Sequence, residues 1–248
     1  MSNTISSSVI DMLVGYASQY ETKDFLNGDP SSFMHQVEGA KDREIMAFIA
    51  SGLSYGSRQQ FMPRIEWLMN RADKHPYDWI MSGDFACELP ESATDCFYRL
   101  HTVSDIHAFL SSYRMLLEEH GSLKALVAKE ATDGLSAVAA LCKAFAGAGS
   151  VVPRDAKSAC KRVCMFLRWM VRSESPVDIG LWADIIDRRT LIMPLDTHVL
   201  QESCRLGLLS SKTTTMTSAL RLTECVRQIF PDDPLRADFA LFGYGINN

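Results

Sequence analysis

The basic residues of the chain gather in one segment, residues 151–172. This segment holds six basic side chains and one acidic side chain, a net charge of +5, which leaves −10 for the rest because the whole chain carries −5. Lysine and arginine concentrated in an otherwise acidic protein are typical of a surface that binds phosphate groups. The charged residues of the segment are Arg154, Asp155, Lys157, Lys161, Arg162, Arg168 and Arg172.

Helical spacing places four of these cations on one side of a predicted helix over residues 157–172. At 100° per residue, Lys157, Lys161, Arg168 and Arg172 fall within about 80° of one another. Apolar residues such as Phe166 lie between and opposite them and can be buried. The pattern fits two interpretations: the solvated face of an amphipathic helix, or a surface that binds phosphates.

A second candidate for chemistry is Asp196, which stands at the predicted start of a helix over residues 197–205. Pro194 disfavours helix before it, and Gly207 is a typical helix stop. A carboxylate at this position accepts hydrogen bonds from the free N–H groups of the first turn. The residues alone favour a structural N-cap at Asp196 and a packed or solvent-facing His198, with catalysis as the alternative.

Composition places these residues in a folded globular chain. The sequence has 248 residues, 47% hydrophobic and 22% charged, which excludes disordered and low-complexity proteins. The uncharged run at residues 45–57 is too short to span a bilayer, and MSNTISSSVIDML does not resemble a secretory signal. Seven scattered cysteines without a CxxC pair indicate reduced thiols. We expect a cytoplasmic protein without a membrane span, metal or cofactor.

Apolar residues recur at intervals of three and four along the chain, which predicts an all-α fold. Ser104 and Ser122 are suitable N-caps, and Gly121 is a suitable helix stop. The breaks between helices are short, so we expect one compact helical unit over residues 1–248. The expected helices span residues 9–20, 42–54, 58–71, 105–120, 123–129, 135–145, 157–172, 180–186, 197–206, 215–230 and 235–243.

The segment PLDTHVLQESCRLGL, residues 194–208, resembles the aspartate motif of the helix-hairpin-helix DNA glycosylases, the superfamily of endonuclease III and the 8-oxoguanine glycosylases. EIMAFIASGLSYGSRQQ (44–60) and LRADFALFGYG (235–245) resemble the first long helix and a late helix of that fold. SACKRVCMFLRWMVR (158–172) and VDIGLW (177–182) look like an uncharacterised bacterial branch, within which the likeness covers nearly the whole chain. The resemblance implies two helical lobes with a cleft between them and a degenerate helix-hairpin-helix element.

The resemblance also implies which residues react. In these enzymes a lysine amine attacks C1′ of the damaged nucleotide and an aspartate stabilises the developing charge; Lys161 and Asp196 match these positions. A free lysine has a pKa of about 10.4 and must lose its proton to attack, so burial and cationic neighbours such as Arg162 would have to lower that pKa. Lys157 remains a rival candidate for the nucleophile.

DNA contacts and base choice follow from the same likeness. Asp238 and Phe242 are four residues apart and share a helix face, where an archaeal branch of the superfamily holds and stacks the flipped base. That position favours 8-oxoguanine as the substrate; the alternative is that Phe239 and Phe242 are core residues and Asp238 is a solvated or capping residue. DAKSACK (155–161) lacks the glycines of the usual hairpin, so side chains would contact the phosphates instead. The DNA-contacting residues would be Lys157, Ser158, Arg162, Arg168 and Arg172.

These observations predict a monomeric DNA base-excision glycosylase, with AP-lyase activity through a Lys161 Schiff base, that acts on duplex DNA containing a damaged base. The interval of 35 residues from Lys161 to Asp196 is longer than in endonuclease III, and an archaeal 8-oxoguanine glycosylase branch that the chain resembles also has a longer interval. No cysteine cluster follows the last helix, so we expect no iron–sulfur cluster. Two alternatives stay open: a non-catalytic nucleic-acid-binding protein with the same fold, which needs the basic residues but not the reacting pair, and a helical scaffold for a protein partner.

Overall fold

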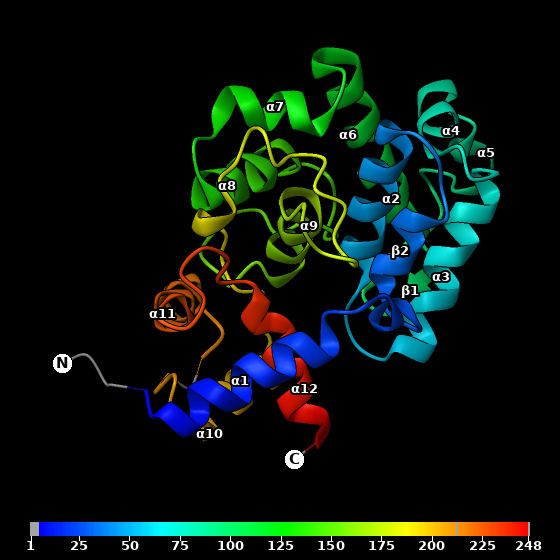
Figure 1. Cartoon of the computed structure of the whole chain (residues 1–248). Coiled ribbons are helices and arrows are strands. Elements are labelled where there is room, and N and C mark those ends of the chain that lie inside the picture. Colours follow the sequence, from blue (N-terminus) through cyan, green and yellow to red (C-terminus); the bar gives the residue numbers. More distant parts are fainter. Residues whose placement is uncertain (1–4, 212, 248) are drawn as a thin grey trace. The chain divides into compact units, whose positions relative to one another are not determined.

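A computed structural model of the chain describes residues 5–211 and 213–247, and these residues are mostly helical (Figure 1). The prediction of an all-α fold is confirmed at this level. The α-helices are α1 (Ser7–Tyr20), α2 (Ala40–Leu53), α3 (Arg58–Arg71), α4 (Pro76–Ser82), α5 (Phe85–Glu88), α6 (Val103–His120), α7 (Leu123–Glu130), α8 (Gly134–Ala144), α9 (Lys161–Val171), α10 (Thr197–Arg205), α11 (Met216–Arg227) and α12 (Arg236–Asn247). The 3-10 helices are η1 (Lys23–Leu26), η2 (Pro30–His35) and η3 (Arg188–Thr190).

Three expectations about individual elements are wrong. A short antiparallel hairpin, β1 (Cys96–Tyr98) and β2 (His101–Thr102), lies between the helices expected at 58–71 and 105–120, where the prediction of an all-α fold included no strand. Residues 180–186 form turns instead of the expected helix. The first α-helix after the hairpin is capped by Thr102, whose side chain accepts from the Asp105 N–H in a capping box, and not by Ser104.

The chain divides into two compact units, which we call unit 1 and unit 2. Unit 1 comprises the described residues within Met1–Phe25, Asp133–Leu135 and Ala156–Asn248, and unit 2 those within Leu26–Thr132 and Ser136–Asp155. All of the candidate site residues lie in unit 1. The two glycosylase-like lobes with a cleft between them remain a prediction.

Aromatic rings fill the core of unit 2. Phe48 of α2 lies 5.7 Å from Phe109 and 4.8 Å from Phe145, measured between ring centroids. The buried Glu44 carboxylate accepts the N–H groups of Leu123 and Lys124, at 2.8 and 3.1 Å, and so satisfies the free N-terminus of α7. The core of this unit therefore joins helices that are far apart in the sequence.

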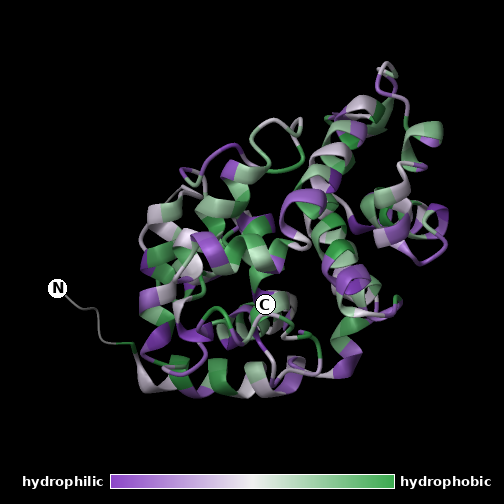
Figure 2. Cartoon of the chain, turned by 90° about the horizontal axis from the view of Figure 1, so that it is seen from above, coloured by the Kyte–Doolittle hydropathy of each residue, from purple (hydrophilic) through white to green (hydrophobic). Residues whose placement is uncertain are grey.

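In unit 1, α1 and α12 lie side by side, although they come from opposite ends of the sequence (Figure 1). Phe25 lies 4.9 Å from both Phe239 and Phe242 of α12. Helix α9 is buried over almost its whole length, from Val163 to Val171. Most helices carry both hydrophobic and hydrophilic residues (Figure 2), as is typical of amphipathic helices that pack on a core.

Gly243 allows α12 to approach α1 closely. A Cβ at this position would overlap the ring of Tyr20 and lie 3.2 Å from Cβ of Tyr16. We expect Gly243→Ala to lower the free energy of unfolding by about 1–3 kcal/mol, because this is the usual cost of overfilling a packed interior. Urea denaturation measures the change.

Gly15 on α1 provides the matched control, because a Cβ added there meets nothing within 4 Å. Gly15→Ala should stabilise the protein by up to about 1 kcal/mol, since alanine favours helix over glycine. Equal effects at the two positions would contradict the close approach at Gly243.

Candidate active site

The structure brings Lys161 and Asp196 together. Nζ of Lys161 lies 3.6 Å from Oδ2 of Asp196, and the two side chains are 31% and 37% exposed. Lys161 is the first residue of α9, and Asp196 immediately precedes α10. An amine and a carboxylate that are both partly exposed can reach a molecule that binds at the surface.

Asp196 is held in place by its position as an N-cap. Its Oδ1 accepts the Val199 N–H at 2.9 Å, as the sequence predicts. The other carboxylate oxygen, Oδ2, is the one near Lys161. His198 in the first turn of α10 is exposed. The carboxylate therefore has a structural role and also faces the amine.

The backbone turn before α9 sets the direction of Lys161. Cys160 has φ 45°, in the left-handed region that favours glycine, although it is a buried cysteine. Before this turn, Ser158 forms a β-bridge with Thr215, and the Met216 N–H donates to the Lys157 carbonyl at 3.3 Å. The segment before Lys161 is therefore tied to the start of α11.

Because of this turn, the helix expected over residues 157–172 starts later than predicted. The helix begins at Lys161, so Lys157 and Ser158 precede it and the argument from helical spacing does not apply to Lys157. Lys157 and Ser158 are exposed, and Arg162 is half-buried. Spacing alone did not reveal this start, since Asp155 to Cys160 contain no proline or glycine.

Arg168 and Arg172 do not lie on a solvated face, and that part of the prediction is wrong. Their side chains are 4% and 2% exposed. Both do emerge from the same side of α9, but this side is covered by other parts of unit 1. Both guanidiniums are instead bound by carboxylates of the same unit.

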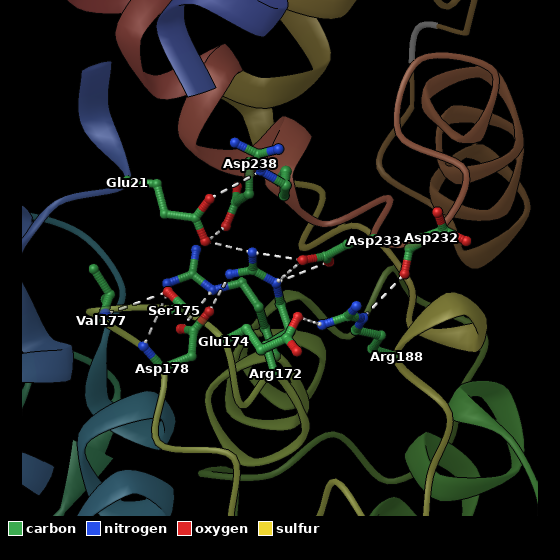
Figure 3. Close-up of polar contacts among 12 residues, drawn as sticks. Glu21, Arg172, Glu174, Ser175, Val177, Asp178, Arg188, Asp232, Asp233 and Asp238 are labelled. Atoms are coloured by element: carbon green, nitrogen blue, oxygen red, sulfur yellow. Dashed lines mark hydrogen bonds and ion pairs between the residues drawn. The ribbon is translucent and has the colours of Figure 1, made fainter. Parts of the chain in front are cut away.

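Acidic side chains from distant parts of the sequence surround Arg172 (Figure 3), and two acids also bind Arg168. Arg172 donates to Asp178, to Glu21 at 2.5 Å and to Asp233 at 2.8–3.0 Å. Arg168 donates to Asp178 at 3.2 Å and also to Asp238. We call Arg168, Arg172 and these four acids, Glu21, Asp178, Asp233 and Asp238, the buried charge network.

Burial and ion pairing oppose each other in this network. Burial raises the pKa of the Asp178 carboxyl, while the positive charges of Arg168 and Arg172 lower it. Burial also acts to lower the pKa of Arg172, but the Asp178 and Asp233 carboxylates leave that pKa raised. Arg172 therefore stays charged, and its ion pairs join separate segments of the sequence within unit 1.

A cavity of about 580 Å³ adjoins the Arg172 end of the network. Arg188 and Arg236 line it together with Glu174 and Asp233. Arg172 lies 11 residues after Lys161, or about 16 Å along α9. The cavity is therefore separate from the Lys161–Asp196 pair.

The two residues expected to hold a base have protein partners. Asp238 accepts from Arg168, and its side chain is 16% exposed. Phe242 is partly buried, with its ring 4.9 Å from Phe25 and 5.7 Å from Tyr20. A base-binding role for Asp238 and Phe242 remains a prediction.

Sequence reasoning missed three of the four acids of the network and gave the fourth, Asp238, a different role. Asp178 offered one signal, since it lies between Val177 and Ile179, where an isolated carboxylate needs a partner if it is buried. Glu21 and Asp233 stand in polar surroundings and gave none.

No described helix is long and apolar enough to cross a membrane. The described part of the chain contains no group of three or more His, Cys, Asp or Glu side chains that could hold a metal ion.

Comparison with known proteins identifies a family. A search of curated proteins and a search of solved structures found no match. The model of the family described as "Protein of unknown function (DUF2400)" matches residues 29–247, which include Lys161, Asp196 and Asp238. The chain therefore belongs to the DUF2400 family.

Proposed function

We propose that the chain is a DNA base-excision glycosylase in which the Lys161 amine is the nucleophile and the Asp196 carboxylate is its electrostatic partner. The observation that carries the proposal is the 3.6 Å approach of Lys161 Nζ and Asp196 Oδ2. These residues are 35 positions apart in the sequence and stand at the starts of different helices. The resemblance of residues 194–208 to the glycosylase aspartate motif supports the same two roles.

The chemistry needs both groups. The neutral Lys161 amine forms a bond to C1′ of the damaged nucleotide, and the bond from C1′ to the base breaks. The base leaves with the electron pair and takes up a proton. Asp196 stabilises the positive charge that develops on the sugar. The adduct then opens to a Schiff base, which supports cleavage of the DNA strand by elimination.

The resemblance supports duplex DNA with an oxidised purine, such as 8-oxoguanine, as the substrate. The proposal also includes the two-lobed fold that the resemblance implies, a monomer, and the cytoplasmic location that the scattered cysteines indicate. In the degenerate hairpin at residues 155–161, the left-handed backbone of Cys160 takes the place of a glycine turn. Phosphate contacts are assigned to Lys157, Ser158 and Arg162, since Arg168 and Arg172 are buried.

Borohydride trapping tests the nucleophile. Borohydride reduces a lysine Schiff base to a stable amine, so the unaltered chain should become covalently bound to a duplex that contains 8-oxoguanine. Lys161→Gln should abolish this adduct and leave duplex binding largely intact, because glutamine keeps the length of the side chain but cannot attack. Gel electrophoresis measures the adduct.

Lys157→Gln is the matched control for this experiment. It removes a nearby exposed lysine, and so should weaken binding while keeping some trapping. Adduct formation by Lys161→Gln and not by Lys157→Gln would move the nucleophile to Lys157. A panel of duplexes with different damaged bases, none of them trapped, would contradict the enzymatic proposal.

The exposure of Lys157 and Ser158 beside Arg162 also fits a second function, non-catalytic binding of nucleic acid. If Lys157 contacts a phosphate, Lys157→Ala should weaken duplex binding irrespective of sequence and lower the salt slope by about 0.9. Fluorescence anisotropy at several salt concentrations measures this slope. Lys129→Ala, which removes an exposed lysine of α7, should leave it unchanged. An unaltered slope in Lys157→Ala would remove this residue from the DNA contacts.

A further inference from the structure

The cavity of about 580 Å³ beside the Arg172 end of the buried charge network takes no part in the proposed reaction. Its volume lies in the range of pockets that hold small organic molecules, about 300–1,000 Å³. All of its lining residues belong to unit 1. The groups that line it therefore indicate the chemistry of a ligand that one compact unit can bind.

Two arginines that line the cavity still have N–H groups to offer. Arg188 donates through Nε to the Asp232 carbonyl at 3.1 Å and through Nη1 to Glu174 at 2.7 Å (Figure 3). Arg236 donates through Nε to Glu21 at 3.1 Å. Within the described part of the chain, Nη2 of Arg188 and both Nη atoms of Arg236 have no bonding partner. The two side chains are 32% and 38% exposed, so a ligand can reach these donors.

The carboxylates of the cavity differ in how firmly they are held. Asp233 accepts from the buried Arg172 at 2.8–3.0 Å, and Glu21 accepts from Arg172 at 2.5 Å. Glu174 and Asp232 are exposed, so solvent screens their repulsion of an anion. The side chain of Glu174 is 77% exposed, and exposed ion pairs are weak. An anion that enters the cavity can therefore displace Glu174 from Arg188.

Apolar residues also line the cavity. Cζ of Arg236 lies 5.6 Å from the centroid of the Phe230 ring. Pro176 and Pro231 are exposed and belong to the same lining. Nucleobases stack on aromatic side chains and on the planes of arginines. The cavity can therefore cover a planar ring as well as bind a charged group.

We propose that this cavity binds a nucleoside monophosphate, with its phosphate on Arg188 and Arg236 and its base against the apolar residues. Guanidinium groups bind phosphate oxygens through strong, charge-assisted hydrogen bonds. The same phosphate group occurs on a free nucleotide and at the 5′ end of a DNA strand. Because Lys161 and Asp196 do not line the cavity, this binding is independent of the proposed reaction.

Isothermal titration calorimetry with deoxyguanosine 5′-monophosphate tests the proposal. The unaltered chain should bind this nucleotide at least about 10-fold more tightly than deoxyguanosine, which lacks the phosphate. Arg188→Gln should weaken binding by about 10-fold or more, because a hydrogen bond to a charged group is lost. Arg189→Gln is the matched control: Arg189 is the next residue, is 62% exposed and does not line the cavity, so this variant should keep the affinity.

Glu174→Gln gives a test of opposite sign. It should tighten binding about 3-fold, because the carboxylate that competes with the phosphate for Arg188 has lost its charge. Since Glu174 is highly exposed, this variant should fold even if Arg188→Gln does not. Weaker binding by Glu174→Gln would mean that the cavity prefers cations, and would overturn the proposal.

Further outcomes distinguish the sites and the sources of the phosphate. Absence of nucleotide binding, or equal affinities for Arg188→Gln and the unaltered chain, would overturn the proposal. Binding that is lost in Lys161→Gln but kept in Arg188→Gln would place the nucleotide at the Lys161–Asp196 pair and overturn it as well. Competition by a 5′-phosphorylated oligonucleotide, and not by the same strand with a 5′-hydroxyl, would support the strand end as the source; competition by neither would support the free nucleotide.

Discussion

Asp196→Asn should fold, bind damaged duplex at least as well as the unaltered chain, and excise the base about 100-fold more slowly or worse. Asparagine caps a helix nearly as well as aspartate, so the hydrogen bond from the Val199 N–H should persist. It cannot supply the negative charge that stabilises the sugar, and losing such a contribution costs on the order of 100-fold in rate or more. Binding should not weaken, because a negative charge near the phosphates is removed.

Single-turnover excision and thermal melting measure the two effects in the same protein. Asp187→Asn provides the control, because Asp187 also caps a short helix, where it accepts the Arg189 N–H at 2.9 Å. It should change neither the excision rate nor the melting temperature by much. If Asp196→Asn unfolds, the carboxylate is structural; if it is stable and fully active, Asp196 is not catalytic.

Arg172→Met should lower the free energy of unfolding by about 3–5 kcal/mol, the usual cost of removing one partner from a buried ion pair. Methionine fills much of the volume of arginine but leaves Glu21, Asp178 and Asp233 without its charge. Asp178 would keep only the bond from Arg168 among its two arginine partners. Urea denaturation measures the change.

Arg189→Met is the matched control for Arg172→Met. Arg189 also forms an ion pair, at 2.5 Å with Asp187, but it is exposed. Exposed pairs contribute about 0–1 kcal/mol, so this variant should be nearly as stable as the unaltered chain. Similar losses for the two variants would mean that burial of the Arg172 network contributes little to stability.

Local signals in the sequence predicted much of the helical structure. The spacing of apolar residues predicted α3 at its observed bounds, Arg58–Arg71. Ser122 accepts the Ala125 N–H, and Gly121 has φ 80°, so the predicted cap and stop are confirmed. Asp196 is the predicted N-cap of α10. These features depend on residues within a few positions of one another.

The buried charge network could not be predicted in this way. Spacing correctly placed Arg168 and Arg172 on one side of a helix, but spacing does not reveal what covers that side. Their partners range from Glu21 to Asp238, and only the folding of unit 1 brings these distant segments together. The meeting of Lys161 and Asp196 was expected from the family resemblance, since nothing local to either residue indicates the other.

Because unit 1 is assembled from segments on both sides of unit 2, the order of synthesis constrains its folding. Unit 2 is complete once residue 155 has emerged from the ribosome, and domains generally fold as units during synthesis. Helix α9 follows soon afterwards, but Asp233 and Asp238 are made much later. Arg168 and Arg172 therefore lack these two carboxylate partners until residues 233–238 have been synthesised. The nascent chain thus acquires the full environment of its proposed nucleophile only after residue 238 has been synthesised.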